Sequence, residues 1–166
     1  MAIPEHEHRV RQATPSDAGV VAELLDAFNR EFDTPSPGTE VIAARFRRLI
    51  AGDHLVVLLP SEPVVGVAVL SFRPNIWYEG PVATLDELYV RPDMRRQRFG
   101  HAMLEAACHL ARERGAQELE VYVDGDDTDA RRFYEAHGFV NTEPGATEPM
   151  FYYHRDLGRQ QDRAVR

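Results

Sequence analysis

The stretch from Thr84 to Gly100, TLDELYVRPDMRRQRFG, constrains the fold of this chain most, because a strand pattern in it stops at a proline. Thr84 to Val90 mixes β-branched and apolar residues, and Pro92 has no N–H for a sheet ladder, so the strand has to end before it. Apolar residues then recur at helical spacing from Phe99 to Leu110, and Gly115 is typical of a helix end. The stretch therefore predicts a strand, a loop and a helix in succession.

The loop between this strand and this helix is basic although the chain is acidic. It holds four arginines and one acid, a local charge of +3, whereas the whole chain has a formal net charge of −8. A helix N-terminus offers unpaired N–H groups and a partial positive charge, so guanidinium groups placed just before it favour an anion, most naturally a phosphate. The alternative is a solvated, arginine-rich turn. The charged residues are Arg91, Asp93, Arg95, Arg96 and Arg98.

The length and composition indicate a single globular domain. A chain of 166 residues can bury about 70% of its unfolded surface in one core. We expect the core over about 8–157 and a frayed tail at 158–166. No apolar run approaches the length of a membrane span, and the first residues, MAIPEHEH, lack the basic and apolar regions of a signal peptide, so we expect a cytoplasmic protein without membrane contact.

The charged residues exclude several classes of protein. All 19 basic residues are arginine, which excludes a lysine Schiff base and a P-loop with its lysine. The acidic balance argues against nucleic-acid binding and suits a cationic partner. The acidic run over 124–129 lacks the glycine of a calcium loop, and the seven histidines show no paired ligand spacing, so we expect no metal site.

The remaining periodicity predicts an α+β fold of three layers, with a mixed, mostly antiparallel twisted sheet of six to seven strands and helices on both faces. A capping threonine, Thr14, and an acid three residues later, Asp17, indicate the start of the first helix. The expected strands lie over 10–13, 54–59, 64–72, 84–90, 118–123, 139–142 and 150–154, and the expected helices lie from Thr14 to about Phe28 and over 39–52, 99–114 and 127–137.

Two segments resemble motifs of the GNAT superfamily of N-acetyltransferases. Residues 95–100, RRQRFG, resemble its acyl-CoA-binding pattern (Gln/Arg)-x-x-Gly-x-(Gly/Ala), with Arg98 where the family usually has glycine. Residues 127–139 resemble Asn-x-x-Ala-x-x-Phe-Tyr-x-x-x-Gly-Phe, with Asp127 in place of asparagine. Both motifs occur in the family's order and spacing. The chain is therefore identified as a member of this superfamily, which implies one N-acetyltransferase domain over 1–166 with the GNAT fold and acetyl-CoA as co-substrate.

The resemblance also implies how acetyl-CoA is held. The pantetheine arm pairs as an added strand with the backbone of the 84–90 strand, and the diphosphate lies on backbone amides at the start of the following helix. A carboxylate at position 127 can only accept hydrogen bonds, so one contact made by the usual asparagine should be lost or altered. The implied cofactor residues are Leu88, Tyr89, Val90, Arg95, Arg96, Gln97, Arg98, Phe99, Gly100, His101, Asp127 and Arg131.

Acetyl transfer to an amine needs a base and benefits from an acid, and the resemblance implies Glu87 and Tyr134. Deprotonating an alkylammonium near neutral pH costs roughly 4 kcal/mol without help. Glu87 is expected to accept that proton directly or through water, or else only to hold the ammonium, and Tyr134 to protonate the departing thiolate, or else to pack as a core aromatic. On a regular strand, Asp86 and Glu87 cannot both face the cleft; a bulge would make Asp86 the candidate.

The sequence leaves the amine acceptor open. Trp77 and Tyr78 could form a cation-binding wall, with Glu31 and Asp33 opposite and Asp86 as a further acid, or Trp77 could pack in a surface cluster or a homodimer contact. The pattern is similar to the diamine and polyamine N-acetyltransferase branch, so a small cationic amine is expected. Aminoglycosides and protein or peptide amines are alternatives, as is a non-catalytic acyl-CoA sensor, because two usual motif residues are replaced.

Overall fold

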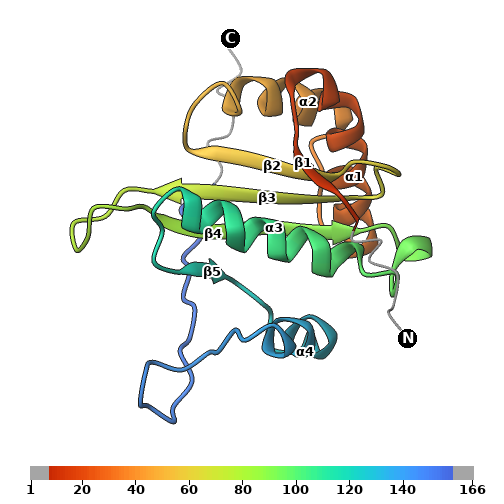
Figure 1. Ribbon diagram of the computed structural model, residues 1–166. Coiled ribbons are helices and arrows are strands. Elements are labelled where there is room, and N and C mark those ends of the chain that lie inside the picture. The colour runs from red at the N-terminus through yellow and green to blue at the C-terminus, as the bar shows by residue number, and fades with distance from the viewer. Residues whose placement is uncertain (1–7, 159–166) are drawn as a thin grey trace, which may run out of the picture. The chain divides into compact units, whose positions relative to one another are not determined.

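The computed structural model describes residues 8–158, which form two compact units, one that ends at Val121 and one that begins at Tyr122 (Figure 1). None of the helices in this range is long and apolar enough to span a bilayer. The first unit contains β1 (Val10–Gln12), η1 (Pro15–Asp17), α1 (Ala18–Glu31), α2 (Thr39–Leu49), β2 (Leu55–Pro60), β3 (Gly66–Arg73), β4 (Val82–Val90), η2 (Pro92–Met94), α3 (Phe99–Glu113) and β5 (Leu119–Val121). The second unit contains α4 (Thr128–Ala136).

The first unit is built on a five-stranded sheet in the order β1-β2-β3-β4-β5. Neighbouring strands are antiparallel except for β4 and β5, which are parallel. A parallel pair requires a crossover connection, and α3 provides it by packing on β2, β3 and β4 (Figure 1). The mixed, mostly antiparallel sheet predicted from the sequence is confirmed.

Different helices cover the two faces of the sheet, which confirms the three layers. On β3, Val67 and Val69 belong to a buried cluster with residues of α1 and α2. Gly66 faces the other way, because a Cβ at Gly66 would lie 2.7 Å from Cε of Met103 in α3. Since side chains alternate along a strand, odd-numbered positions of β3 face α1 and α2 and even-numbered positions face α3.

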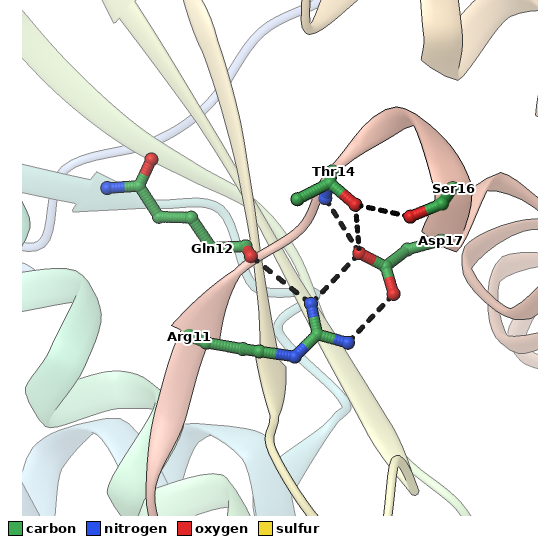
Figure 2. Close-up of polar contacts among 5 residues, drawn as sticks. All are labelled: Arg11, Gln12, Thr14, Ser16 and Asp17. Carbon is green, nitrogen blue, oxygen red and sulfur yellow. Dashed lines mark hydrogen bonds and ion pairs between the residues drawn. The ribbon is translucent and has the colours of Figure 1, made fainter.

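The chain enters α1 through η1, where several hydrogen bonds converge on the Asp17 carboxylate (Figure 2). Asp17 accepts hydrogen bonds from both terminal nitrogens of Arg11, at 2.8 and 2.9 Å, and from the backbone N–H of Thr14 at 2.7 Å. These contacts, with the Arg11 hydrogen bond as the largest cause, hold the pKa of Asp17 well below its usual range. The acid that the sequence predicts three residues after the cap therefore fixes both the helix entry and the edge strand β1.

Replacing Asp17 by Asn should lower the free energy of unfolding at neutral pH by about 1 to 2 kcal/mol, the sum of a lost cap and a partly exposed ion pair. Because the folded-state pKa of Asp17 is depressed, its contribution is present above the unfolded value of about 3.9 and is lost as the pH falls below it. Denaturant unfolding of both proteins across this range measures the difference, which should shrink in acid. The exposed Asp53→Asn is the control, and a difference that does not change with pH would contradict the ion pair.

The second unit departs from the expected strands. Segments 139–142 and 150–154 form no strand, and between residues 122 and 158 the only bridge joins Thr142 to Pro149. The described sheet therefore has five strands, not six to seven. Met150 to Tyr153 have strand-forming side chains, but strand propensity depends on a packed neighbouring strand, and these side chains are exposed. The tail expected to fray lies, from residue 159 on, outside the described residues.

Candidate active site

A β-bulge in β4 lies at the two carboxylates that the sequence singled out. Val69 of β3 pairs with Glu87, but the next residue, Leu70, pairs with Leu85, so Asp86 and Glu87 together stand opposite Val69. Such a bulge adds one residue to one strand and interrupts its alternation. Because Glu87 shares a row with Val69, it lies on the face that α1 and α2 cover.

Asp86 lies on this same face. Its carboxylate accepts a hydrogen bond from the side chain of Ser71, which occupies an odd-numbered position of β3. The expectation that only one of the two acids can face a cleft holds for a regular strand, and the bulge removes it. The bulge does not exchange Glu87 for Asp86, as expected, but leaves Glu87 in the row of Val69 and adds Asp86 on the same face. The sequence named both acids as candidates but could not show that the strand is irregular between them.

Asp86 and Glu87 are both exposed residues, yet the protein atoms around their carboxylates raise the pKa of each. Desolvation raises the pKa of Glu87, and the neighbouring charge of Asp86 raises it further. Desolvation also raises the pKa of Asp86, while the hydrogen bond from Ser71 lowers it in part. A carboxylate with a raised pKa is a stronger base than a free one, so the pair can accept a proton from a substrate.

The edge of β4 that faces β5 has no partner strand from the bulge onward. The parallel ladder with β5 joins Ala83, Thr84 and Leu85 to residues 119–121, and no later residue of β4 pairs on that edge within the described chain. Backbone groups of Leu88–Val90 that point to this edge, apart from the Val90 carbonyl oxygen that accepts from Arg95 Nε, are therefore available to an extended ligand. This edge is where the resemblance expects the pantetheine arm.

The arginine loop, residues 91–98, is partly neutralised by carboxylates. Arg91 pairs with Asp93 at 2.8 Å, and Arg95 pairs with Glu31 of α1 at 2.7 Å. The side chains of Arg96 and Arg98 make no ion pair or hydrogen bond within residues 8–158. The excess charge that the sequence predicts for this loop therefore rests on Arg96 and Arg98.

Arg96 and Arg98 also have left-handed backbones, with φ of 60° and 67°. This conformation costs a non-glycine residue roughly 1–2 kcal/mol. A left-handed residue followed directly by a helical one turns consecutive N–H groups to one side, a geometry that binds anions. Arg98 stands directly before Phe99, the first residue of α3, so the backbone shape that glycine usually provides is kept without glycine.

Replacing Arg98 by Gly should raise the free energy of unfolding by about 1 kcal/mol, because the left-handed conformation no longer carries a Cβ. CoA affinity should stay the same or increase if the anion is held by backbone N–H groups. Thermal unfolding and calorimetry with CoA measure the two quantities. Arg98→Ala is the matched control, since it removes the charge but keeps the strain, and a similar large loss of affinity in both variants would show that the side chain binds the anion.

The start of α3 is fixed from two sides. The His8 ring stacks on the Phe99 ring, with centroids 3.6 Å apart, and His8 Nε2 lies 2.6 Å from the carbonyl oxygen of Gln97. Phe99 itself is buried, whereas Gly100 and His101 lie half-buried in the first turn of α3. Sequence reasoning missed His8, because nothing in its local pattern indicates a contact with residues 89 positions away.

The second unit holds the other predicted site residues, in and before α4. The Asp127 carboxylate caps this helix by accepting a hydrogen bond from the Ala130 N–H at 3.0 Å, and Arg131 donates to the Gly125 carbonyl oxygen at 2.9 Å. Tyr134 is half-buried, with its ring edge-on to Phe133 and Phe139 at centroid distances of 5.2 and 5.4 Å. Two further aromatics thus orient the tyrosine that the resemblance implies as the acid.

The residues expected to form a wall for the acceptor are not all brought together. Trp77 is 86% exposed and the Tyr78 hydroxyl is buried without a hydrogen-bond partner, in a loop that the Asn75 side chain holds by accepting from both backbone N–H groups. This loop precedes β4. Glu31 instead contacts Arg95, which donates to the carbonyl oxygen of Val90 at the other end of β4. The two groups are therefore separated by the length of that strand.

The Acetyltransferase (GNAT) family model matches residues 21–139. A solved structure, a putative acetyltransferase from Arthrobacter sp. FB24, is 58% identical with a TM-score of 0.86 and covers 95% of this chain and 99% of that one. The aminoalkylphosphonate N-acetyltransferase of Salmonella typhimurium is 29% identical over 139 residues, 84% of this chain and 86% of the relative. An aminoglycoside N(6')-acetyltransferase type 1 of Klebsiella aerogenes is 44% identical over 67 residues, 39% of this chain and 44% of the relative, so this chain spans less than half the length of that protein.

Proposed function

Because the chain belongs to the GNAT family of acetyltransferases, we propose that it transfers an acetyl group from acetyl-CoA to a primary amine of a small cationic acceptor. The bulge in β4 carries this proposal. It sets Asp86 and Glu87 on one face of the sheet, with raised pKa values, at the point where the edge of β4 becomes open. A single domain over 1–166 and a cytoplasmic location stay predictions.

The described residues fit acetyl-CoA in two respects. The open edge at Leu88–Val90 suits the pantetheine arm of acetyl-CoA, because the amide groups of an extended ligand can form main-chain hydrogen bonds with β4 as an added strand would. Arg96 and Arg98, two unpaired charges on left-handed backbones before α3, suit a diphosphate. Bound acetyl-CoA supplies a thioester whose carbonyl carbon an amine can attack.

Glu87 is the proposed base. It accepts the proton that the attacking ammonium must lose, directly or through one water molecule, and its raised pKa reduces the free-energy cost of that transfer. Asp86 contributes by its charge, which raises the pKa of Glu87, and both acids attract a cationic acceptor. If Glu87 only holds the ammonium, its removal would weaken acceptor binding without slowing the bound complex.

Tyr134 is the proposed acid. As the C–S bond of the thioester breaks and the N–C bond of the amide forms, the Tyr134 hydroxyl donates its proton to the departing sulfur. A phenol of pKa near 10 is only about 1.5 pKa units above a thiol, so this donation costs about 2 kcal/mol. The residue's place in the segment that resembles the second family motif supports the proposal.

For the acceptor, the two acids in an acidic chain favour a polyamine or diamine. An aminoglycoside is the second candidate, supported by the curated relatives that are aminoglycoside N(6')-acetyltransferases. An aminoalkylphosphonate is a third, because a curated relative that matches most of this chain acts on that class by name. Of these three acceptors, only the phosphonate carries an acidic group, which the two carboxylates would repel, so it should be the poorest acceptor.

Thiol release from acetyl-CoA by the purified full chain tests the proposal across spermidine, short diamines, an aminoglycoside, an aminoalkylphosphonate and a lysine-containing peptide. We expect release with at least one cationic small amine and a matching acetylated product by mass spectrometry. Release with the peptide alone would overturn the small-acceptor proposal. CoA binding without release on any acceptor would favour a binding module instead.

A further inference from the structure

We propose that Glu31 and Arg95 form a clamp that positions the arginine loop for acetyl-CoA, so that Glu31 serves cofactor binding and not recognition of the amine acceptor. The inference rests on the proposed function, because it concerns the loop that would hold the diphosphate. Neither residue is assigned a catalytic step. Both are positioning residues that act through the backbone of residues 96–98.

The clamp joins segments that are 64 residues apart in the chain. Arg95 Nη1 donates to Glu31 Oε1 at 2.8 Å and Arg95 Nη2 to Glu31 Oε2 at 2.7 Å, while Arg95 Nε donates to the Val90 carbonyl oxygen at 2.9 Å. This bidentate pairing fixes the orientation of the Arg95 guanidinium as well as its distance from Glu31. One side chain thus ties the loop both to the end of α1 and to the end of β4.

An aromatic platform supports the clamp. The guanidinium carbon of Arg95 lies 5.8 Å from the centroid of the Tyr89 ring, within the range of a cation–π contact. The Tyr89 ring in turn stacks on Phe28 of α1, with centroids 5.1 Å apart, and Tyr89 is 4% exposed. Arg95 therefore rests on a buried surface that cannot shift easily, and its partner Glu31 projects from the same helix as Phe28.

The position of Glu31 in its helix also indicates a role beyond α1. Glu31 is the last residue of α1, where the partial negative charge of the helix end disfavours a carboxylate. A residue that breaks a local preference usually has a compensating contact elsewhere. Here that contact is Arg95, which supplies the opposite charge.

The clamp gives the arginines of the loop different roles. Because the Glu31 carboxylate already engages both terminal nitrogens of Arg95, the charge of Arg95 is neutralised and Arg96 and Arg98 remain for an anion. Arg96, the first of the two left-handed residues, follows Arg95 directly, so a fixed Arg95 sets where the next N–H groups of the loop point. Apart from the clamp, the described contacts of residues 92–97 outside the loop are limited to the one between Gln97 and His8, while Arg91 and Arg98 anchor the loop's two ends by backbone hydrogen bonds.

Calorimetric titration of the full chain with CoA tests whether the Glu31–Arg95 pair supports CoA binding. Glu31→Gln should weaken binding about fivefold and Arg95→Gln about tenfold, the range of a well-aligned ion pair at a partly exposed site. The charge-swapped double variant Glu31→Arg with Arg95→Glu should recover only part of this loss, because it restores the ion pair but not the contacts of Arg95 with the Val90 carbonyl oxygen and the Tyr89 ring. Glu23→Gln, the same change at an exposed position of α1, is the control and should bind as the original does.

Steady-state kinetics separate the clamp from the alternatives. The KM for acetyl-CoA should rise in Glu31→Gln while kcat and the KM for the acceptor hold, and removing a carboxylate from the helix end does not weaken α1. Equal or tighter CoA binding by Glu31→Gln would overturn the clamp, because a released Arg95 would then be a phosphate ligand. A raised acceptor KM with unchanged CoA affinity would also overturn it. Failure of the original chain to bind CoA would instead overturn the proposed function and the clamp with it.

Discussion

Replacing Tyr134 by Phe should lower kcat by about 100-fold or more, the usual contribution of a positioned acid, and leave CoA affinity unchanged. The substitution removes only the hydroxyl, so the ring contacts with Phe133 and Phe139 remain. A single-turnover assay with saturating acceptor measures the chemical step directly. The loss should be smaller for a thioester whose thiol has a lower pKa, because such a sulfur leaves without a proton.

The control for this experiment is Tyr153→Phe, which removes a hydroxyl from a tyrosine that is 87% exposed in the same unit. It should retain full turnover. If Tyr134→Phe lowers turnover and CoA affinity equally, the residue holds the cofactor. If it changes neither, Tyr134 packs as an aromatic and another group protonates the sulfur.

Replacing Glu87 by Gln should lower kcat/KM by about 100-fold at neutral pH and abolish the acid limb of the pH–rate profile. A base acts in its ionised form, so activity is present above its pKa and is lost as the pH falls through it. Because burial and Asp86 raise the pKa of Glu87, this limb should lie above the ordinary value of about 4.3.

Asp86→Asn distinguishes the two acids. Removing the charge of Asp86 should lower the pKa of Glu87, so the acid limb should move to lower pH with a smaller loss of activity than in Glu87→Gln. If Asp86→Asn causes the larger loss, Asp86 is the base and Glu87 tunes it. A loss confined to the acceptor KM in both variants would make the pair a binding site for the ammonium.

Much of the fold was predictable because its signals are local. Pro92 ends β4, the acid three residues after Thr14 marks the approach to α1, and Phe99 to Leu110 repeat at helical spacing, so the order and type of the elements in the first unit follow from short stretches. The strands expected in the second unit were wrong because a strand requires a partner. The propensity of Met150 to Tyr153 does not provide one.

The sequence could name candidate site residues but not the geometry that relates them. Asp86, Glu87 and the arginines could be named from motif positions, whereas the bulge that sets both acids on one face depends on the register against β3. The pairing of Glu31 with Arg95 was hidden for the same reason. A contact between residues 64 positions apart leaves no trace in a local pattern, so the sequence suggested Glu31 as an acid for the acceptor and not as a partner of Arg95.

The open edge of β4 also bears on how the protein avoids aggregation. An unpaired strand edge is a template on which another chain can add a strand. Here the ladder with β5 ends before the bulge at Asp86 and Glu87, and Pro92 beyond the end of β4 has no N–H to donate. Only the short run Leu88–Val90 lies between these two points. That run is long enough for a narrow, flexible ligand, but a strand from another molecule would pair there over three residues without the chain connection that the equally short β1 and β5 have to the sheet, so it would gain little by binding.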